Sequence, residues 1–93
     1  MRKEMTLTVL GHIAGNIRRL RERKKLTQEE LAEMSETDTR FIQRIERGVV
    51  NFSIDILVSI AEALGVSPTT LFRPSKISVP KPGRPSKKRK KKK

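Results

Sequence analysis

Apolar residues recur at helical spacing in the first quarter of the chain. Ile13, Ile17 and Leu20 stand at i, i+4 and i+7, the spacing that places side chains on one face of a helix. The residues between and after them are largely charged, as expected for the outer face of a surface helix. The pattern predicts a first helix from about Thr8 to Lys24.

A second, shorter helical pattern begins at Thr27. Glu30 follows three residues later, so the pair matches a capping box, in which each side chain bonds to the other's backbone amide. We therefore expect a short helix starting just after Thr27. Its predicted apolar positions are Leu31, Ala32 and Met34.

A polar break at residues 36–37 separates this helix from a third one. Asp38 is the expected N-cap of the third helix, and Gly48 suits the left-handed residue that often follows a helix. Ile42 and Ile45 are expected to face inward, and at 100° per residue the opposite face carries polar side chains. These outward residues are Arg40, Gln43, Arg44 and Arg47.

A fourth helix is predicted over residues 54–64, between Ser53 as N-cap and Gly65. Its apolar residues cover more than half of its circumference, so it lies centrally in the core or offers part of its surface to a partner. Ser67-Pro68 opens a last short helix through Phe72. No segment alternates like a strand, and the sequence predicts an all-α domain of five helices over residues 1–72.

Charge is distributed unevenly along the chain, whose net charge is +12. Residues 1–72 hold eleven basic and ten acidic residues, whereas residues 73–93 hold eleven basic residues and no acid. A nearly neutral domain thus carries a basic, proline-containing tail, which we expect to be disordered when free. Such a tail favours a polyanion as partner, nucleic acid before an anionic membrane surface.

The residue types present exclude several classes of site. The chain has no cysteine and a single histidine, His12, so we expect no disulfide, thiolate nucleophile or metal site. Thr27 and Ser53 are explained as helix caps, and no constellation of residues supports an enzyme. No cofactor or small-molecule ligand is expected. No apolar run approaches the ~20 residues of a membrane span, and the expected location is the bacterial cytoplasm, in association with the nucleoid.

The order of residues from position 13 to 72 resembles the Cro/C1-type (XRE) helix-turn-helix family of phage repressors, controller proteins and bacterial regulators. Three stretches carry the resemblance, namely Ile17 to Ala32, Phe41 to Gly48 and Asn51 to Phe72. The resemblance implies a lambda-repressor-like fold and a transcriptional regulator that binds double-stranded DNA. It also implies a homodimer that places the third helix of each copy in the major groove.

The resemblance also implies roles for individual residues. Arg21 and Glu46 match a structural salt bridge, and Gln28 matches a residue that binds a DNA phosphate. The expected base contacts are Thr39, Arg40, Gln43 and Arg44, and the expected phosphate contacts are Thr27, Gln28, Arg47 and Asn51. The expected dimer surface comprises the fourth helix with Val66, Leu71 and Phe72.

The sequence departs from the family pattern at two turns and one loop. Lys25 and Glu36 stand where the family usually has glycine, and Val49-Val50 replaces a pair that is often basic. These valines leave open an alternative function, in which the same fold is a protein-interaction module, antitoxin-like or coactivator-like. That module would bind its partner through the valines and the fourth helix.

Within the tail, residues 81–88 resemble an AT-hook, whose Gly-Arg-Pro core lies in the minor groove of A·T-rich DNA. The expected contacts of this hook are Gly83, Arg84, Pro85, Lys87 and Lys88. A generic electrostatic arm is an equal alternative. In a eukaryote the final lysine run would also match a nuclear localisation signal.

Overall fold

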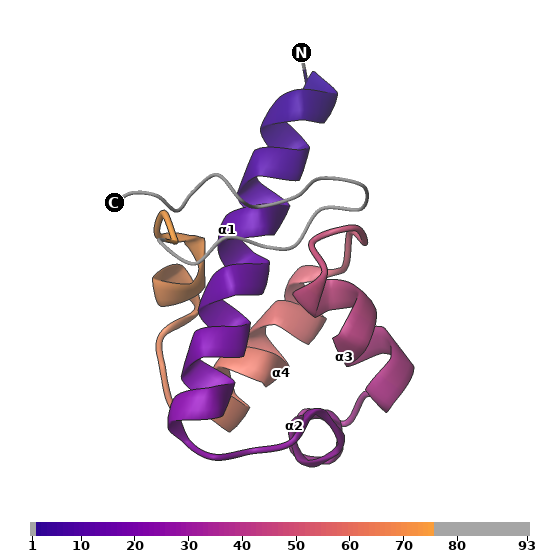
Figure 1. Ribbon diagram of the computed structural model, residues 1–93, viewed down its shortest axis with the longest axis vertical. Helices are drawn as coiled ribbons and strands as arrows, with labels where there is room; N and C mark the ends of the chain where they lie inside the picture. The colour runs from indigo at the N-terminus through magenta and orange to yellow at the C-terminus, as the bar shows by residue number, and fades with distance from the viewer. Residues whose placement is uncertain (1, 76–93) are drawn as a thin grey trace, which may run out of the picture.

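The computed structural model describes residues 2–75, with side chains described from residue 4 onward. Over this part of the chain it contains four α-helices, one 3-10 helix and no strand (Figure 1). The elements are α1 (Arg2–Arg23), α2 (Gln28–Met34), α3 (Thr39–Glu46), α4 (Ile54–Leu64) and the 3-10 helix η1 (Pro68–Phe72).

Helix α1 is longer than predicted, because it begins at Arg2 and not near Thr8. The Thr8 hydroxyl donates to the carbonyl oxygen of Glu4 at 3.0 Å, which satisfies this polar side chain inside a helix. Met5 and Leu7 in the added turns are 67% and 56% exposed. They lie off the buried face of the helix, so the apolar spacing gave no sign of the extension.

The predicted caps of α2 and α3 are confirmed. The Thr27 hydroxyl accepts the amide hydrogen of Glu30 at 2.9 Å, and the Glu30 carboxylate accepts that of Thr27 at 2.8 Å. The Asp38 carboxylate accepts the amide hydrogen of Phe41 at 2.8 Å. These local bonds satisfy amide groups that a helix start would otherwise leave unpaired, and they fix where α2 and α3 each begin.

One predicted apolar position of α2 is wrong. Leu31 and Ala32 are buried, but Met34 is 51% exposed. Ser35 takes the inward place after α2 and is 2% exposed, with its hydroxyl donating to the Leu31 carbonyl at 2.7 Å. A small polar residue fits there because the backbone supplies its hydrogen-bond partner.

The core gathers side chains from all five elements, so that α2 and α3 rest against α1 and α4 (Figure 1). Within α3, Ile42 and Ile45 are 0% and 1% exposed, which confirms their predicted inward orientation. The buried cluster consists of Ile13, Ile17, Leu20, Leu31, Ala32, Ile42, Ile45, Leu57, Ile60, Ala61, Leu64 and Leu71.

The last two elements differ partly from the predicted pair of helices. Helix α4 has the predicted cap, Ser53, and the left-handed Gly65 at its end. However, the fifth element is a single 3-10 stretch and not an α-helix, so the predicted count of five helices is not confirmed. Ser67 caps η1 and Pro68 begins it, and five residues give room for little more than one turn.

Two turns hold non-glycine residues in the left-handed region. Lys25 has φ 61° after α1, and Glu36 has φ 60° between α2 and α3. A side chain in this conformation costs about 1–2 kcal/mol relative to its right-handed form. Both turns therefore store strain at positions that glycine would occupy freely.

We predict that Glu36→Gly raises the free energy of unfolding by about 0.5–1 kcal/mol, because relief of strain exceeds the added entropy of the unfolded chain. Urea unfolding measures this as a higher midpoint at unchanged slope. Glu33→Gly is the matched control, since Glu33 lies inside α2, and it should destabilise by about 1 kcal/mol. Equal destabilisation by both changes would contradict the strain at Glu36.

Candidate nucleic-acid interface

The solvent-facing side of α3 is polar and basic. Arg40, Gln43, Arg44 and Arg47 are all exposed and line one shallow hollow. Thr39, at the first position of the helix, is half-buried. Since the opposite side of α3 is fixed in the core, the core holds these side chains in place as a positively charged surface.

A buried ion pair holds α3 against α1. The Arg21 guanidinium donates to both carboxylate oxygens of Glu46, with Nε to Oε2 at 2.7 Å and Nη2 to Oε1 at 3.1 Å. The two side chains are 12% and 3% exposed. Arg21 Nη1 also donates to the Leu26 carbonyl at 2.8 Å, so the arginine fixes the turn after α1 as well. The structure thus brings together the two residues expected to form a salt bridge.

Gln28 joins the same cluster from the start of α2. Its amide nitrogen Nε2 donates to Glu46 Oε1 at 3.0 Å. Glu46 therefore accepts three hydrogen bonds from side chains on two other helices, which satisfies a carboxylate that is removed from water. In this arrangement the Gln28 amide nitrogen is used inside the protein, so Gln28 ties α2 to α3.

A second hollow adjoins the α3 surface and contains an arginine, Arg18, that is not among the site residues expected from the sequence. Arg18 of α1 lies in this hollow, one helical turn before Arg21. Both hollows share Gln43 and Arg47, so the basic surface continues from α3 onto α1. The i, i+3 spacing of Arg18 and Arg21 is the signal that could have identified it. The lining residues of this second hollow are Arg18, Arg21, Gln28, Gln43, Glu46 and Arg47.

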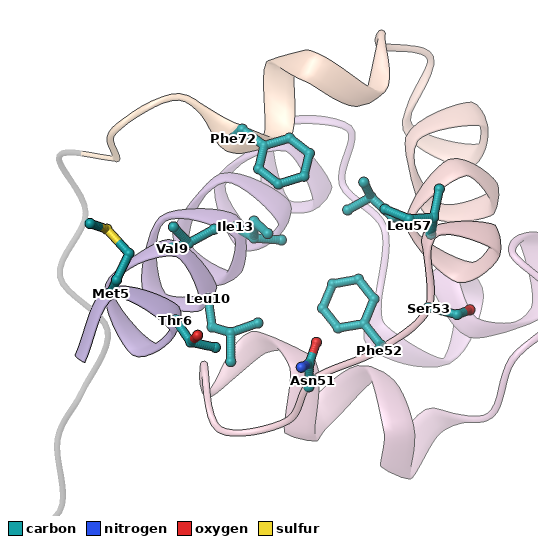
Figure 2. Close-up of a pocket in the computed structure, with 11 residues that line it drawn as sticks. Met5, Thr6, Val9, Leu10, Ile13, Asn51, Phe52, Ser53, Leu57 and Phe72 are labelled. Carbon is teal, nitrogen blue, oxygen red and sulfur yellow. The ribbon is translucent and has the colours of Figure 1, made fainter. Parts of the chain in front are cut away.

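Two other predicted phosphate contacts occupy different surroundings. Thr27 is exposed and its hydroxyl oxygen serves as the cap of α2. Asn51 is also exposed, but it lines an apolar groove with Phe52 and Ser53 and neither of the basic hollows (Figure 2). The structure therefore does not bring Asn51 together with the basic residues of α3.

The predicted dimer surface requires one correction. Leu71 is fully buried, at 0% exposure, because the turn of η1 points it into the core, and its assignment to a dimer surface is wrong. Phe72 is 43% exposed, and Val66 is half-buried against the core. In the loop after α3, Val49 is 57% exposed while Val50 packs against the core, so one valine and not two faces solvent.

The first residues of the predicted basic tail contact α1. Asn16, only 2% exposed, donates from Nδ2 to the carbonyl oxygens of Leu71 and Arg73 at 2.9 and 2.8 Å. His12 Nδ1 accepts the amide hydrogen of Ser75 at 3.1 Å. The expected minor-groove contacts of the tail lie outside the described residues. These are Gly83, Arg84, Pro85, Lys87 and Lys88.

The described part of the chain lacks two further classes of site. No helix there is long and apolar enough to cross a membrane. The same residues contain no group of three or more histidine, aspartate or glutamate side chains placed to hold a metal ion.

The comparisons of this chain with known proteins agree on one family. The family described as helix-turn-helix (HTH_3) matches residues 17–71. The uncharacterized HTH-type transcriptional regulator y4dJ of Sinorhizobium fredii is 38% identical over 63 residues, which cover 68% of this chain and 82% of the relative.

Solved structures show the same fold. The hypothetical transcription factor NHTF from Neisseria has a TM-score of 0.69 at 32% identity, over 71% of this chain and 76% of the other. The restriction-modification controller protein C.AhdI from Aeromonas hydrophila has a TM-score of 0.66 at 36% identity, over 68% of this chain and 96% of the other.

We predict that Arg21→Ala lowers the free energy of unfolding by about 3–5 kcal/mol, because it leaves the Glu46 carboxylate buried without its cationic partner. Denaturant unfolding measures the loss. Arg23→Ala removes an equal charge from an exposed position of α1 and should change stability by less than about 0.5 kcal/mol. A loss of similar size in both variants would show that the ion pair is not what holds α3.

Proposed function

Because the chain belongs to the helix-turn-helix family of transcriptional regulators, we propose that it binds specific DNA sequences and regulates transcription by placing α3 in the major groove. The observation that carries the proposal is the division of α3 into two faces. Ile42 and Ile45 anchor one face in the core, while the other presents a continuous polar surface. An α-helix presented in this way fits the width of the major groove.

The chemistry of the exposed face suits recognition of base edges. Arg40 and Arg44 each carry a forked donor that matches the O6 and N7 acceptors of guanine, and Gln43 matches the edge of adenine. Thr39 lies at the amino end of α3, the end that contacts bases in this class of motif. We assign base contacts to these four residues.

Phosphate contacts are assigned to the edges of the same surface. Arg18 and Arg47 lie in the hollow beside α3, where two guanidinium groups suit an anionic oxygen. Gln28 supports this phosphate contact indirectly, because its hydrogen bond to Glu46 holds the start of α2 against α3. The Thr27 hydroxyl accepts the cap bond, and its own hydrogen remains suited to donate to a phosphate. Asn51 is also assigned a phosphate contact, but it lines the apolar groove and so lies apart from the other proposed phosphate contacts.

The proposed assembly is a homodimer on a pseudopalindromic site, as the resemblance to Cro/C1-type regulators implies. The two recognition helices would then lie about 34 Å apart in successive major grooves. Because Leu71 is buried, it is excluded from the candidate dimer surface. That surface then consists of the outer face of α4 with Val66 and Phe72. Ile54, at the start of α4, is 67% exposed and adds apolar area beside it.

The basic tail adds phosphate contacts, which do not depend on base sequence, or minor-groove contacts, which favour A·T-rich DNA. Ten of its eleven positive residues follow Pro74, and each phosphate that they neutralise releases counterions. The Gly83-Arg84-Pro85 core would add minor-groove contact in A·T-rich DNA. We place the protein accordingly on the bacterial nucleoid, in the cytoplasm.

A second candidate function is a protein-interaction module of the same fold. It is favoured by the exposure of Val49, at 57%, in the loop that follows the recognition helix. The two functions make different demands on Arg40 and Arg44. Recognition of DNA bases requires these arginines, whereas a protein partner bound through this loop and α4 does not.

We predict that Arg40→Ala combined with Arg44→Ala abolishes preference for a selected DNA site, with a loss of about 1–3 kcal/mol for each guanine contact. Fluorescence anisotropy with specific and scrambled duplexes measures the ratio of affinities. Arg19→Ala combined with Arg23→Ala, which removes two charges from α1, is the control and should preserve the ratio. Site preference that survives in the α3 variant would favour the interaction module.

We predict that truncation after Pro74 flattens the dependence of log K on log salt, by about 0.9 for every phosphate contact that is lost. The preference between specific and scrambled duplexes should remain nearly intact, since base contacts are assigned to α3. Titrations at several salt concentrations measure both quantities. An unchanged slope would show that the tail does not contact DNA.

A further inference from the structure

Both edges of the apolar face of α1 continue past the core on which the helix packs. Met5 stands four residues before Val9, which packs against the core, and Leu7 stands three residues before Leu10, which is buried. Residues at these spacings are neighbours on a helix surface. Met5 and Leu7 are nevertheless 67% and 56% exposed, because the amino-terminal turns of α1 extend beyond the other helices (Figure 1).

An open groove adjoins these exposed turns. Met5 and Thr6 line it from α1, Leu57 lines it from α4, and Phe52 and Phe72 line it from the segments before and after α4 (Figure 2). None of its eleven lining residues is charged, although 34% of the residues in the chain are. Such a groove is stabilised when apolar side chains cover it, and a charged occupant would lose water without gaining a partner.

The same chain contains an element whose chemistry matches the groove. With His12 counted as neutral, residues 5–17 are the longest run without a charged residue in the sequence. The exposed members of this run are residues 5–8, which form the projecting turns of α1. The groove is uncharged and largely apolar, and so are the turns beside it, so a second copy of this chain offers the occupant that the groove requires.

The position of the groove beside the projecting turns fits a two-fold dimer. Both copies use the same patch in such an interface, so a groove and the element that fills it must lie on one face. Met5 lines the groove itself, and Leu7 lies two residues further along the same turn. Each contact then occurs twice, which brings two short helix ends closer to the ~1,200–2,000 Å² that stable interfaces bury.

We propose that the amino-terminal turns of α1 from a second copy of this chain occupy the groove, in a two-fold exchange that buries Leu7 of each copy. The inference rests on the homodimer of the proposed function and extends its surface. Ile54 and Phe72, which belong to that surface, also line the groove. The exchange adds α1 to an interface that was otherwise assigned to α4, Val66 and Phe72.

The test compares Leu7→Glu with Thr8→Glu in the full-length protein without DNA. Both variants add one negative charge at exposed, adjacent positions of α1, but at 100° per residue Thr8 lies on the side away from the apolar face. Analytical ultracentrifugation measures the dissociation constant of the dimer. Leu7→Glu should raise it by about 100-fold or more, because the apolar contact is lost in both copies. Thr8→Glu should change it by less than about fivefold.

NMR on a mixture of labelled and unlabelled wild-type protein is the second measurement, and it should show contacts between copies from the Leu7 methyl groups to Phe52 or Phe72. Equal dissociation constants in the two variants, or contacts between copies that are confined to the outer face of α4, would overturn the inference and leave the proposed homodimer intact. A wild-type chain that stays monomeric would overturn both. Site preference of α3 is measured with DNA duplexes, so its failure is a separate result.

Discussion

The buried carboxylate of Glu46 is the constraint on which the rest of the site depends. It is 3% exposed and receives hydrogen bonds from Arg21 on α1 and Gln28 on α2. A charge removed from water requires such partners, so the hydrogen bonds of Glu46 tie the three helices together in the observed arrangement. Since Glu46 follows Ile45 directly on α3, the same bonds fix the rotation of α3. Arg40, Gln43 and Arg44 are thereby held toward solvent.

The uneven distribution of charge along the chain underlies the division of tasks proposed for the domain and the tail. The domain over residues 1–72 is nearly neutral, so the DNA contact proposed for it is assigned to the geometry of a few side chains on α3 and α1. The tail concentrates positive charge without acidic residues, and charge of this kind binds any phosphate backbone in a salt-dependent manner. Specificity and general affinity are thus assigned to separate parts of one short chain.

Local chemistry made much of this structure predictable. The caps at Thr27, Asp38 and Ser53 depend on residues three positions apart, and the inward side of α3 follows from helical spacing. Features that depend on distant residues were missed. Leu71 is buried because η1 packs on α1, Ser35 and not Met34 is buried at the end of α2, and the hollow at Arg18 is formed where α1, α2 and α3 meet. The early start of α1 was missed because Met5 and Leu7 lie off its buried face.

Selection of bound sequences from a random pool of duplex DNA tests the central claim most directly, namely that the described domain carries the specificity. The selection compares the full chain with a chain that ends at Ser75. The account predicts that both enrich the same motif, with symmetric half-sites about one helical turn apart, and that the shorter chain requires lower salt to do so. A motif that disappears or changes when residues 76–93 are removed would contradict it.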